Sequence, residues 1–228
     1  MEMKTIKKVF KEFLKEQKDH LSSRTLRGYE DAIFLFQDYL NDYASQYLDK
    51  QETENFEKKG KDFCEIFTPD QIGSTEINEF LNYFMIRKVM GSKELMKNVS
   101  RAMKKLVKWM NEKGYMEEED YERGTEIAGR AKDELPQCEE LANLIYECCE
   151  YGDYEEYTEK VDGYLQVTKI QPGKLWFEEY TGSGKKIGPV HVDYAISSLC
   201  KVGWVINLVL GKTRRGWKML ESGNVYPH

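Results

Sequence analysis

The segment from Ser92 to Lys113 carries six basic residues at helical spacing, and such a group of cations could bind phosphate groups. At about 100° per residue they fall within an arc of roughly 120° on one helix face, opposite an apolar face. From Arg87 to Lys113 nine basic residues stand against two acidic ones, in a chain of formal net charge −6. The six are Lys93, Lys97, Arg101, Lys104, Lys105 and Lys108.

A cationic face in an acidic protein indicates a local anionic partner, and duplex DNA is the first candidate. A charged stripe is more often a solvated helix face. Such faces normally mix both signs of charge, however, and this one hardly does. The helix alone therefore favours DNA or another polyanion over a plain solvated surface.

A second basic group crowds one predicted hairpin turn, beside Trp217. Basic groups next to aromatic rings can bind nucleic acid by stacking its bases. Because Trp176 and Trp204 lie on predicted strands, we expect them in the core instead. The turn itself is exposed, so either nucleic acid or a protein partner could use it. Its basic residues are Lys212, Arg214, Arg215 and Lys218.

Motifs for nucleotide or metal chemistry are missing. Gly184-Lys185 lacks the following Ser or Thr of a phosphate-binding loop, and Gly211-Lys212-Thr213 lacks its first glycine. The five cysteines contain no Cys-x-x-Cys pair and the three histidines are scattered, which predicts reduced structural thiols and no metal or other cofactor. We therefore expect a protein that is not an enzyme, with an enzyme of unrecognised site as a weaker alternative.

Four amphipathic helices are expected to position the cationic face. They are predicted at 3–18, at about 23–43 with a Ser22 or Ser23 cap, from Ser74 or Thr75 to Gly91, and from the Ser92 cap to Gly114. Residues 45–71 are polar and charge-dense, and they predict a partly ordered insertion with a short helix at most.

The pattern changes after the helices. Residues 117–135 predict a solvated acidic linker, followed by a short helix at about 137–150. From residue 161 the pattern alternates with period two, and turn signals separate four or five short strands. These strands predict a small closed SH3-like or OB-like β-barrel. The expected parts are a helical domain at 1–120, an acidic connector with one short helix at 121–160, and the barrel at 161–228.

No run of about 18 apolar residues occurs, so no membrane span is expected. The N-terminal segment mixes charged and apolar residues at helical spacing and lacks the apolar centre of a signal peptide. We therefore predict a cytoplasmic protein without a membrane partner.

The first 116 residues resemble the core-binding domain of the tyrosine recombinases, or phage integrases. Ser22-Ser23-Arg24-Thr25-Leu26-Arg27-Gly28-Tyr29 looks like the family's Ser-x-x-Thr-x-x-x-Tyr pattern at the start of its first long helix. EINEFLNYFM and SKELMKNVSRAMKKLVKWMNEKGYM resemble two further helices of that domain. In the latter, Arg101 takes the position of the family arginine, and Trp109 falls one step off the usual aromatic pair.

This resemblance implies an α+β chain in which an N-terminal SAM-like four-helix bundle grips duplex DNA and a small barrel follows. It places the start of the first long helix and the fourth helix near DNA. Hydroxyl groups and free N–H groups at a helix N-terminus can hold a phosphate, with basic residues beside them. The residues concerned are Ser22, Ser23, Arg24, Thr25 and Arg27.

The family's catalytic constellation is missing. It requires a His-x-x-Arg motif, but His20 leads to Ser23 and His191 leads to Tyr194. We therefore expect no strand cleavage. The leading hypothesis is a non-catalytic DNA-binding protein that makes mainly phosphate contacts, an accessory or competitor in DNA recombination or integration. The alternative is a protein-interaction adaptor whose β-barrel binds a protein partner.

Overall fold

The fold is mixed α+β, with a helical N-terminal region and a C-terminal five-stranded sheet. A computed structural model describes residues 4–89, 91–149 and 157–227. The chain divides into two units, Met1–Asp133 and Glu134–His228.

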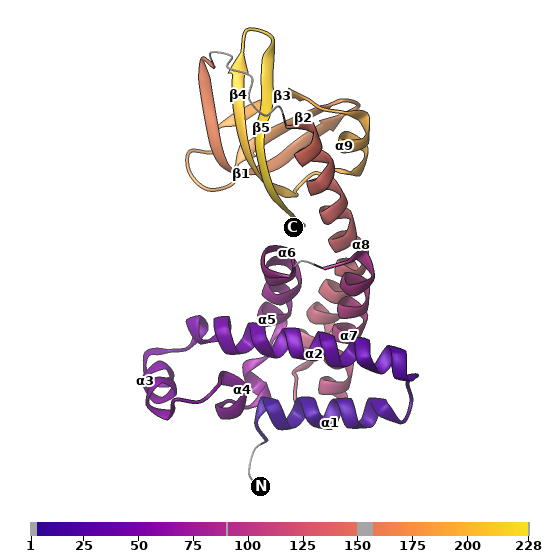
Figure 1. Cartoon of the computed structure of the whole chain (residues 1–228). Coiled ribbons are helices and arrows are strands. Elements are labelled where there is room, and N and C mark those ends of the chain that lie inside the picture. Colours follow the sequence, from indigo (N-terminus) through magenta and orange to yellow (C-terminus); the bar gives the residue numbers. More distant parts are fainter. Residues whose placement is uncertain (1–3, 90, 150–156, 228) are drawn as a thin grey trace. The chain divides into compact units, whose positions relative to one another are not determined.

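The first unit is built from helices (Figure 1). Eight α-helices begin within the described residues up to 149, so the predicted count of four is wrong. The segments α5, the π-helical η3 and α6 follow one another directly and together form the predicted third helix. The elements are α1 (Ile6–Lys18), α2 (Ser23–Tyr43), η1 (Ala44–Tyr47), α3 (Lys50–Lys59), α4 (Phe63–Ile66), η2 (Pro69–Gln71), α5 (Ser74–Glu79), η3 (Phe80–Phe84), α6 (Met85–Lys88), α7 (Lys93–Glu112) and α8 (Glu118–Cys148).

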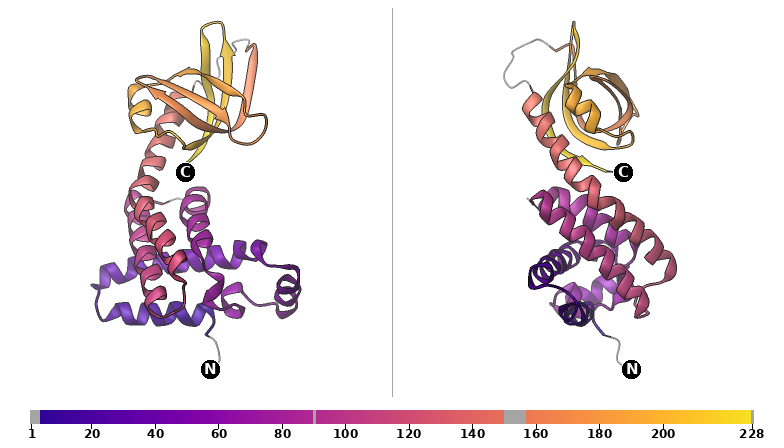
Figure 2. Two further views of the ribbon diagram at one scale, coloured as in Figure 1. Left: turned by 180° about the vertical axis from the view of Figure 1, so that it is seen from behind. Right: turned by 90° about the vertical axis from the view of Figure 1, so that its right-hand side faces the viewer.

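Aromatic side chains from α1, α2 and η3 form the centre of the first unit. The Phe36 ring centroid lies 5.7 Å from that of Phe10 and 4.9 Å from that of Phe80, and all three rings are buried. Such ring pairs contribute about 0.5–1.5 kcal/mol each beyond their burial. Helices α1 and α2 lie side by side, and α7 packs across α2 (Figures 1 and 2).

Helix α7 begins and ends where the sequence predicts. The Ser92 hydroxyl oxygen accepts a hydrogen bond from the Leu95 N–H at 3.2 Å, which caps the helix start. Gly114 adopts φ 73° just after the helix, a conformation that side-chain-bearing residues avoid. The inner face of α7 is buried and the basic residues lie on the opposite face, so the predicted amphipathic helix is confirmed.

Residues 45–71 are more ordered than predicted. They form η1, α3, α4 and η2. Asp49 and Glu52 make a capping box at the start of α3: the Glu52 N–H donates to Asp49 at 2.8 Å, and the Asp49 N–H donates to Glu52 at 3.1 Å. Gly60, with φ 56°, ends α3. No residue of α3 is buried, so the apolar periodicity that reveals other helices is missing here.

The prediction of a linker at 117–135 and a separate short helix is also wrong. Residues Glu118–Cys148 form one helix of 31 residues, with Pro136 inside it. The division between the two units falls within this helix, after Asp133. Residues 150–156, which the predicted connector includes, lie outside the described residues.

Small residues explain why the first part of α8 shows no apolar pattern of a helix in the sequence. Gly124, Ala128 and Ala131 are buried and recur at helical spacing, but they carry little apolar surface. A Cβ on Gly124 would lie 3.3 Å from the Val107 side chain, so α8 needs a small residue where it meets α7.

The second unit contains the strands, which pair in the order β1-β2-β3-β5-β4. Because β4 also pairs with β1, the pairings form a closed ring, and β3 meets β5 in parallel (Figure 2). The alternating segments are confirmed as strands, and one short helix, α9, lies between β3 and β4. The elements are β1 (Glu159–Gln171), β2 (Lys174–Glu179), β3 (Lys186–His191), α9 (Tyr194–Leu199), β4 (Val205–Thr213) and β5 (Gly216–Tyr226).

The core of the second unit lies between the strands and the last part of α8. Leu165, Phe177 and Leu210 from the sheet are fully buried and belong to one cluster with Leu141 and Ile145 of α8. The last part of α8 therefore supplies an apolar stripe to this core. None of the described helices is both long and apolar enough to span a membrane.

Candidate nucleic-acid interface

The outer face of α7 carries a group of cations at helical spacing. Lys97 is half-exposed, and Arg101, Lys104 and Lys105 are exposed. None of these four lies within ion-pair distance of a carboxylate in the described part of the chain. We call these four residues the α7 cation face.

The remaining two basic residues of α7 differ from this group. The Lys108 ammonium lies 3.6 Å from the Glu112 carboxylate one turn later, and both side chains are more than half exposed. Lys93 also has an interaction within the chain. Lys108 therefore starts from a partly compensated state, and its transfer to a phosphate gains less than that of a lysine without an ion pair.

The start of α2 is capped from within. The Ser22 hydroxyl oxygen accepts from the Thr25 N–H at 3.2 Å, and the two hydroxyl groups lie 2.9 Å apart. The Thr25 N–H is therefore occupied, whereas the sequence alone predicts it to be free to bind a phosphate. The N–H groups of Ser23 and Arg24 have no hydrogen-bond partner among the described residues, so these two can still receive an anion.

An open groove of about 600 Å³ joins the start of α2 to α7. Arg24 and Arg27 line it together with Asp31 and Glu94, so its charges balance. The Arg24 guanidinium lies 4.0 Å from the Glu94 carboxylate, but the Arg24 side chain is 92 % exposed, so this pair is weak. The groove thus adds two exposed arginines beside the α7 cation face.

Close packing of the two helices brings their residues together. A Cβ on Gly28 of α2 would lie 3.7 Å from Asn98 of α7, an ordinary contact distance. Burial raises the pKa of the Tyr29 hydroxyl, and the charge of Arg101 opposes that rise, which places Arg101 near α2. Asn98 also accepts a 3.4 Å hydrogen bond from Arg101. The structure therefore brings Arg101 to the junction of α2 and α7.

The basic hairpin turn of the second unit is partly neutralised. The Lys212 ammonium lies 3.4 Å from the Glu159 carboxylate, which also pairs with Lys185. Both ammonium groups lie over the ring of Trp217, at 5.5 Å and 5.9 Å from its centroid. Trp217 is buried under this cover, so its ring is not available for stacking on a base.

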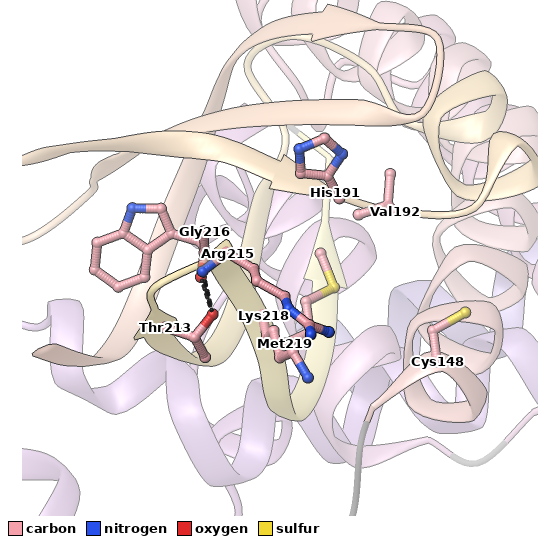
Figure 3. Close-up of a pocket in the computed structure, with 9 residues that line it drawn as sticks. Cys148, His191, Val192, Thr213, Arg215, Gly216, Lys218 and Met219 are labelled. Atoms are coloured by element: carbon pink, nitrogen blue, oxygen red, sulfur yellow. Dashed lines mark hydrogen bonds between the residues drawn. The ribbon is translucent and has the colours of Figure 1, made fainter. Parts of the chain in front are cut away.

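Arg214 and Arg215 remain exposed at that turn, without a carboxylate partner in the described residues. The Thr213 hydroxyl shapes the turn, because it accepts from the Arg215 N–H at 3.1 Å and donates to the Gly216 carbonyl at 3.0 Å. A pocket of about 250 Å³ lies beside the turn, lined also by His191 and Cys148 (Figure 3). Sequence reasoning missed this pocket because its residues are far apart in the chain.

The pocket is poorly suited to cysteine chemistry. The Cys148 thiol donates to the Asp193 carboxylate at 3.2 Å. Burial, followed by Asp193, raises the pKa of this thiol to about 11. A thiol with such a pKa stays protonated at neutral pH and is a weak nucleophile.

The other two tryptophans of the second unit, Trp176 and Trp204, differ in burial. Trp204 is buried, as expected for a core residue. Trp176 is half-buried, and the Lys169 ammonium lies 4.7 Å from its ring centroid. Neither tryptophan offers an open ring face like that of a base-stacking platform.

Comparison with known proteins finds no relative: no protein-family model, no curated protein and no solved structure matches this chain. The resemblance to the core-binding domain of tyrosine recombinases therefore rests on the residue patterns in α2, α5 to α6, and α7.

Proposed function

We propose that this chain is a non-catalytic protein that binds duplex DNA through the phosphate backbone. The observation that carries the proposal is the α7 cation face, four exposed or half-exposed cations on one helix without carboxylate partners in the described residues. Cations that have no internal partner gain most when they replace the counterions condensed on DNA.

The start of α2 supplies a second set of contacts. The N–H groups of Ser23 and Arg24 point to an anion site at a helix N-terminus, and Arg27 lies in the same groove. The resemblance to the recombinases supports this arrangement, because it places the corresponding two helices near DNA. We assign the first unit as a SAM-like domain and the second as an SH3-like or OB-like barrel in place of a catalytic domain.

Contacts of this kind fix the position of the protein on the duplex without reading its sequence. The resulting affinity depends strongly on salt and little on base sequence. A protein with these properties and no cleavage chemistry would act as an accessory or competitor in DNA recombination or integration.

Fluorescence anisotropy with a labelled duplex of random sequence tests the proposal. The four phosphate contacts of the α7 cation face predict that log K falls with log salt with a slope of about −3.6 between about 50 and 200 mM salt, and contacts from Arg24 and Arg27 make the slope steeper. A second duplex of different sequence should give the same affinity and slope. Absence of binding at the lowest salt, or an affinity independent of salt, contradicts the proposal.

The exposed pair Arg214 and Arg215 favours a second candidate, a protein-interaction adaptor that uses the hairpin turn of the sheet. Replacement of both arginines with Gln separates the two candidates. If the α7 cation face is the main DNA contact, this variant keeps most of its DNA affinity. Complete loss of DNA affinity would move the DNA site to the turn.

A further inference from the structure

A pocket lined by aromatic rings lies in the first unit, apart from the α7 cation face. It has a volume of about 350 Å³ and is bordered by α2, η1, α5, η3 and α6. The π-helical turn of η3 brings two of the rings to it, and π-helical turns recur at functional sites. The residues that matter are Tyr39, Tyr43, Tyr47, Tyr83, Phe84 and Glu79.

The rings form a packed wall. Tyr39 stacks on Tyr43 with centroids 6.1 Å apart, and Phe84 meets each of these rings edge-on at 5.6 Å. Tyr47 and Tyr83 are exposed at the rim, at 50 % and 38 %. Tyrosine faces carry negative partial charge and attract cations within about 6 Å.

A carboxylate without a counterion completes the lining. Glu79 is half-buried and has no hydrogen bond or ion pair among the described residues. Burial, followed by the charge of nearby Glu76, raises the pKa of Glu79. Glu76 itself is occupied, because it accepts from the Gly73 N–H at 2.8 Å. Lys88 lines the pocket as well, but its ammonium lies over the Tyr43 ring and forms no ion pair with Glu79.

Two tyrosine hydroxyl groups share this environment. Tyr39 is 2 % exposed, and its hydroxyl has no hydrogen-bond partner within the described part of the chain. Burial and then the neighbouring Tyr47 and the two carboxylates raise its pKa. Burial, Glu79 and Glu76 likewise raise the pKa of Tyr47. The Tyr39 hydroxyl therefore has hydrogen-bonding capacity that no described residue uses, and a buried hydroxyl without a partner costs free energy.

Cations already occupy outer faces of this aromatic group. The Lys88 ammonium lies 6.0 Å from the centroid of Tyr43, and the Arg87 guanidinium lies 5.4 Å from that of Tyr83. Neither cation forms an ion pair with Glu79. The tyrosine rings of this pocket therefore accept positive charge, as Lys88 of its own lining shows.

We infer that this pocket binds an organic cation, an alkylammonium group that places its charge beside Glu79 and its methyl groups against the tyrosine rings. The Tyr39 hydroxyl provides an acceptor or a donor for the rest of the ligand. Phosphates and carboxylates are unsuitable, since the Glu79 carboxylate would repel them. The inference does not depend on DNA binding, because no residue of the α7 cation face lines the pocket.

Choline and its neutral isostere 3,3-dimethylbutan-1-ol test the charge requirement. Titration of the full chain, followed by NMR of the tyrosine ring signals, should show choline binding at least about tenfold more tightly than the isostere. A second probe, N-acetyl-trimethyllysine amide, distinguishes a free small molecule from the side chain of a protein. Binding of either cation more tightly than the isostere supports the inference, and equal binding of choline and the isostere overturns it.

Two substitutions locate the site. Glu79→Gln should weaken choline binding about tenfold, whereas Lys88→Met should strengthen it by removal of a competing cation. Glu57→Gln on exposed α3 makes the same charge change away from the pocket and should have no effect. Circular dichroism establishes that each variant is folded. An unchanged affinity in folded Glu79→Gln overturns the assignment of the charge site.

Discussion

Neutralisation of the α7 cation face should reduce the salt dependence of DNA binding by a predictable amount. In the variant Lys97→Gln/Arg101→Gln/Lys104→Gln, three cations that lack carboxylate partners in the described residues are lost. At about 0.9 per contact, the slope of log K against log salt should fall in magnitude by about 2.7. When salt rises fourfold, from about 50 to 200 mM, the affinity of the variant should therefore fall about 40-fold less than that of the wild type.

The fold should survive this change, because Gln is a good helix former and all three positions lie on the outer face of α7. Lys58→Gln/Lys59→Gln/Lys61→Gln is a matched control, since it removes the same charge from exposed positions at the end of α3. Anisotropy titrations at four salt concentrations measure all three proteins. If the control lowers the slope as much as the α7 variant, net charge rather than a built surface causes binding, and the reasoning is refuted.

Four further predictions concern DNA cleavage, two glycine substitutions and the pH dependence of stability. The chain should neither nick nor relax supercoiled plasmid, and a covalent protein–DNA adduct in a denaturing gel would contradict this. Gly28→Ala should stabilise the protein by about 0.5–1 kcal/mol in thermal unfolding, since a Cβ there meets atoms at 3.7 Å or more and Ala suits a helix. Gly211→Ala should lower the melting temperature, since its Cβ would lie 2.6 Å from the Tyr157 ring. Hydrogen bonds from Lys113 and then Trp109 lower the pKa of Glu16. That contribution is present above the ordinary pKa and is lost as the pH falls through the lowered one, so acid should reduce the melting temperature of the wild type more than that of Glu16→Gln.

Elements with strong local signals were predictable from the sequence. The Ser22 and Ser92 caps and the glycine at residue 114 mark the bounds of α2 and α7 within one residue. The period-two pattern and the turn at 171–173 locate β1 and β2. These signals are local, and tertiary packing in this chain agrees with them.

Other elements lacked the signal that the prediction used. The capping box of Asp49 and Glu52 was present in the sequence, but α3 has no apolar stripe to accompany it. In α8, Gly124 and Ala128 face α7, where small size matters more than hydropathy. Pairing between distant segments was out of reach as well: Glu159 neutralises Lys212 from 53 positions away. Local periodicity contains no information about such partners.

The exposed helix α3 has a consequence for how the sequence can change over time. No residue of α3 is buried. Its one aromatic ring, Phe56, is half-buried and lies near Phe63 and Phe67, at 6.1 Å and 5.9 Å between ring centroids. The helix can therefore open while the aromatic centre around Phe36 stays closed. Residues 50–61 should therefore tolerate insertions and substitutions better than the rest of the first unit. A fluorophore attached there should leave both proposed sites undisturbed.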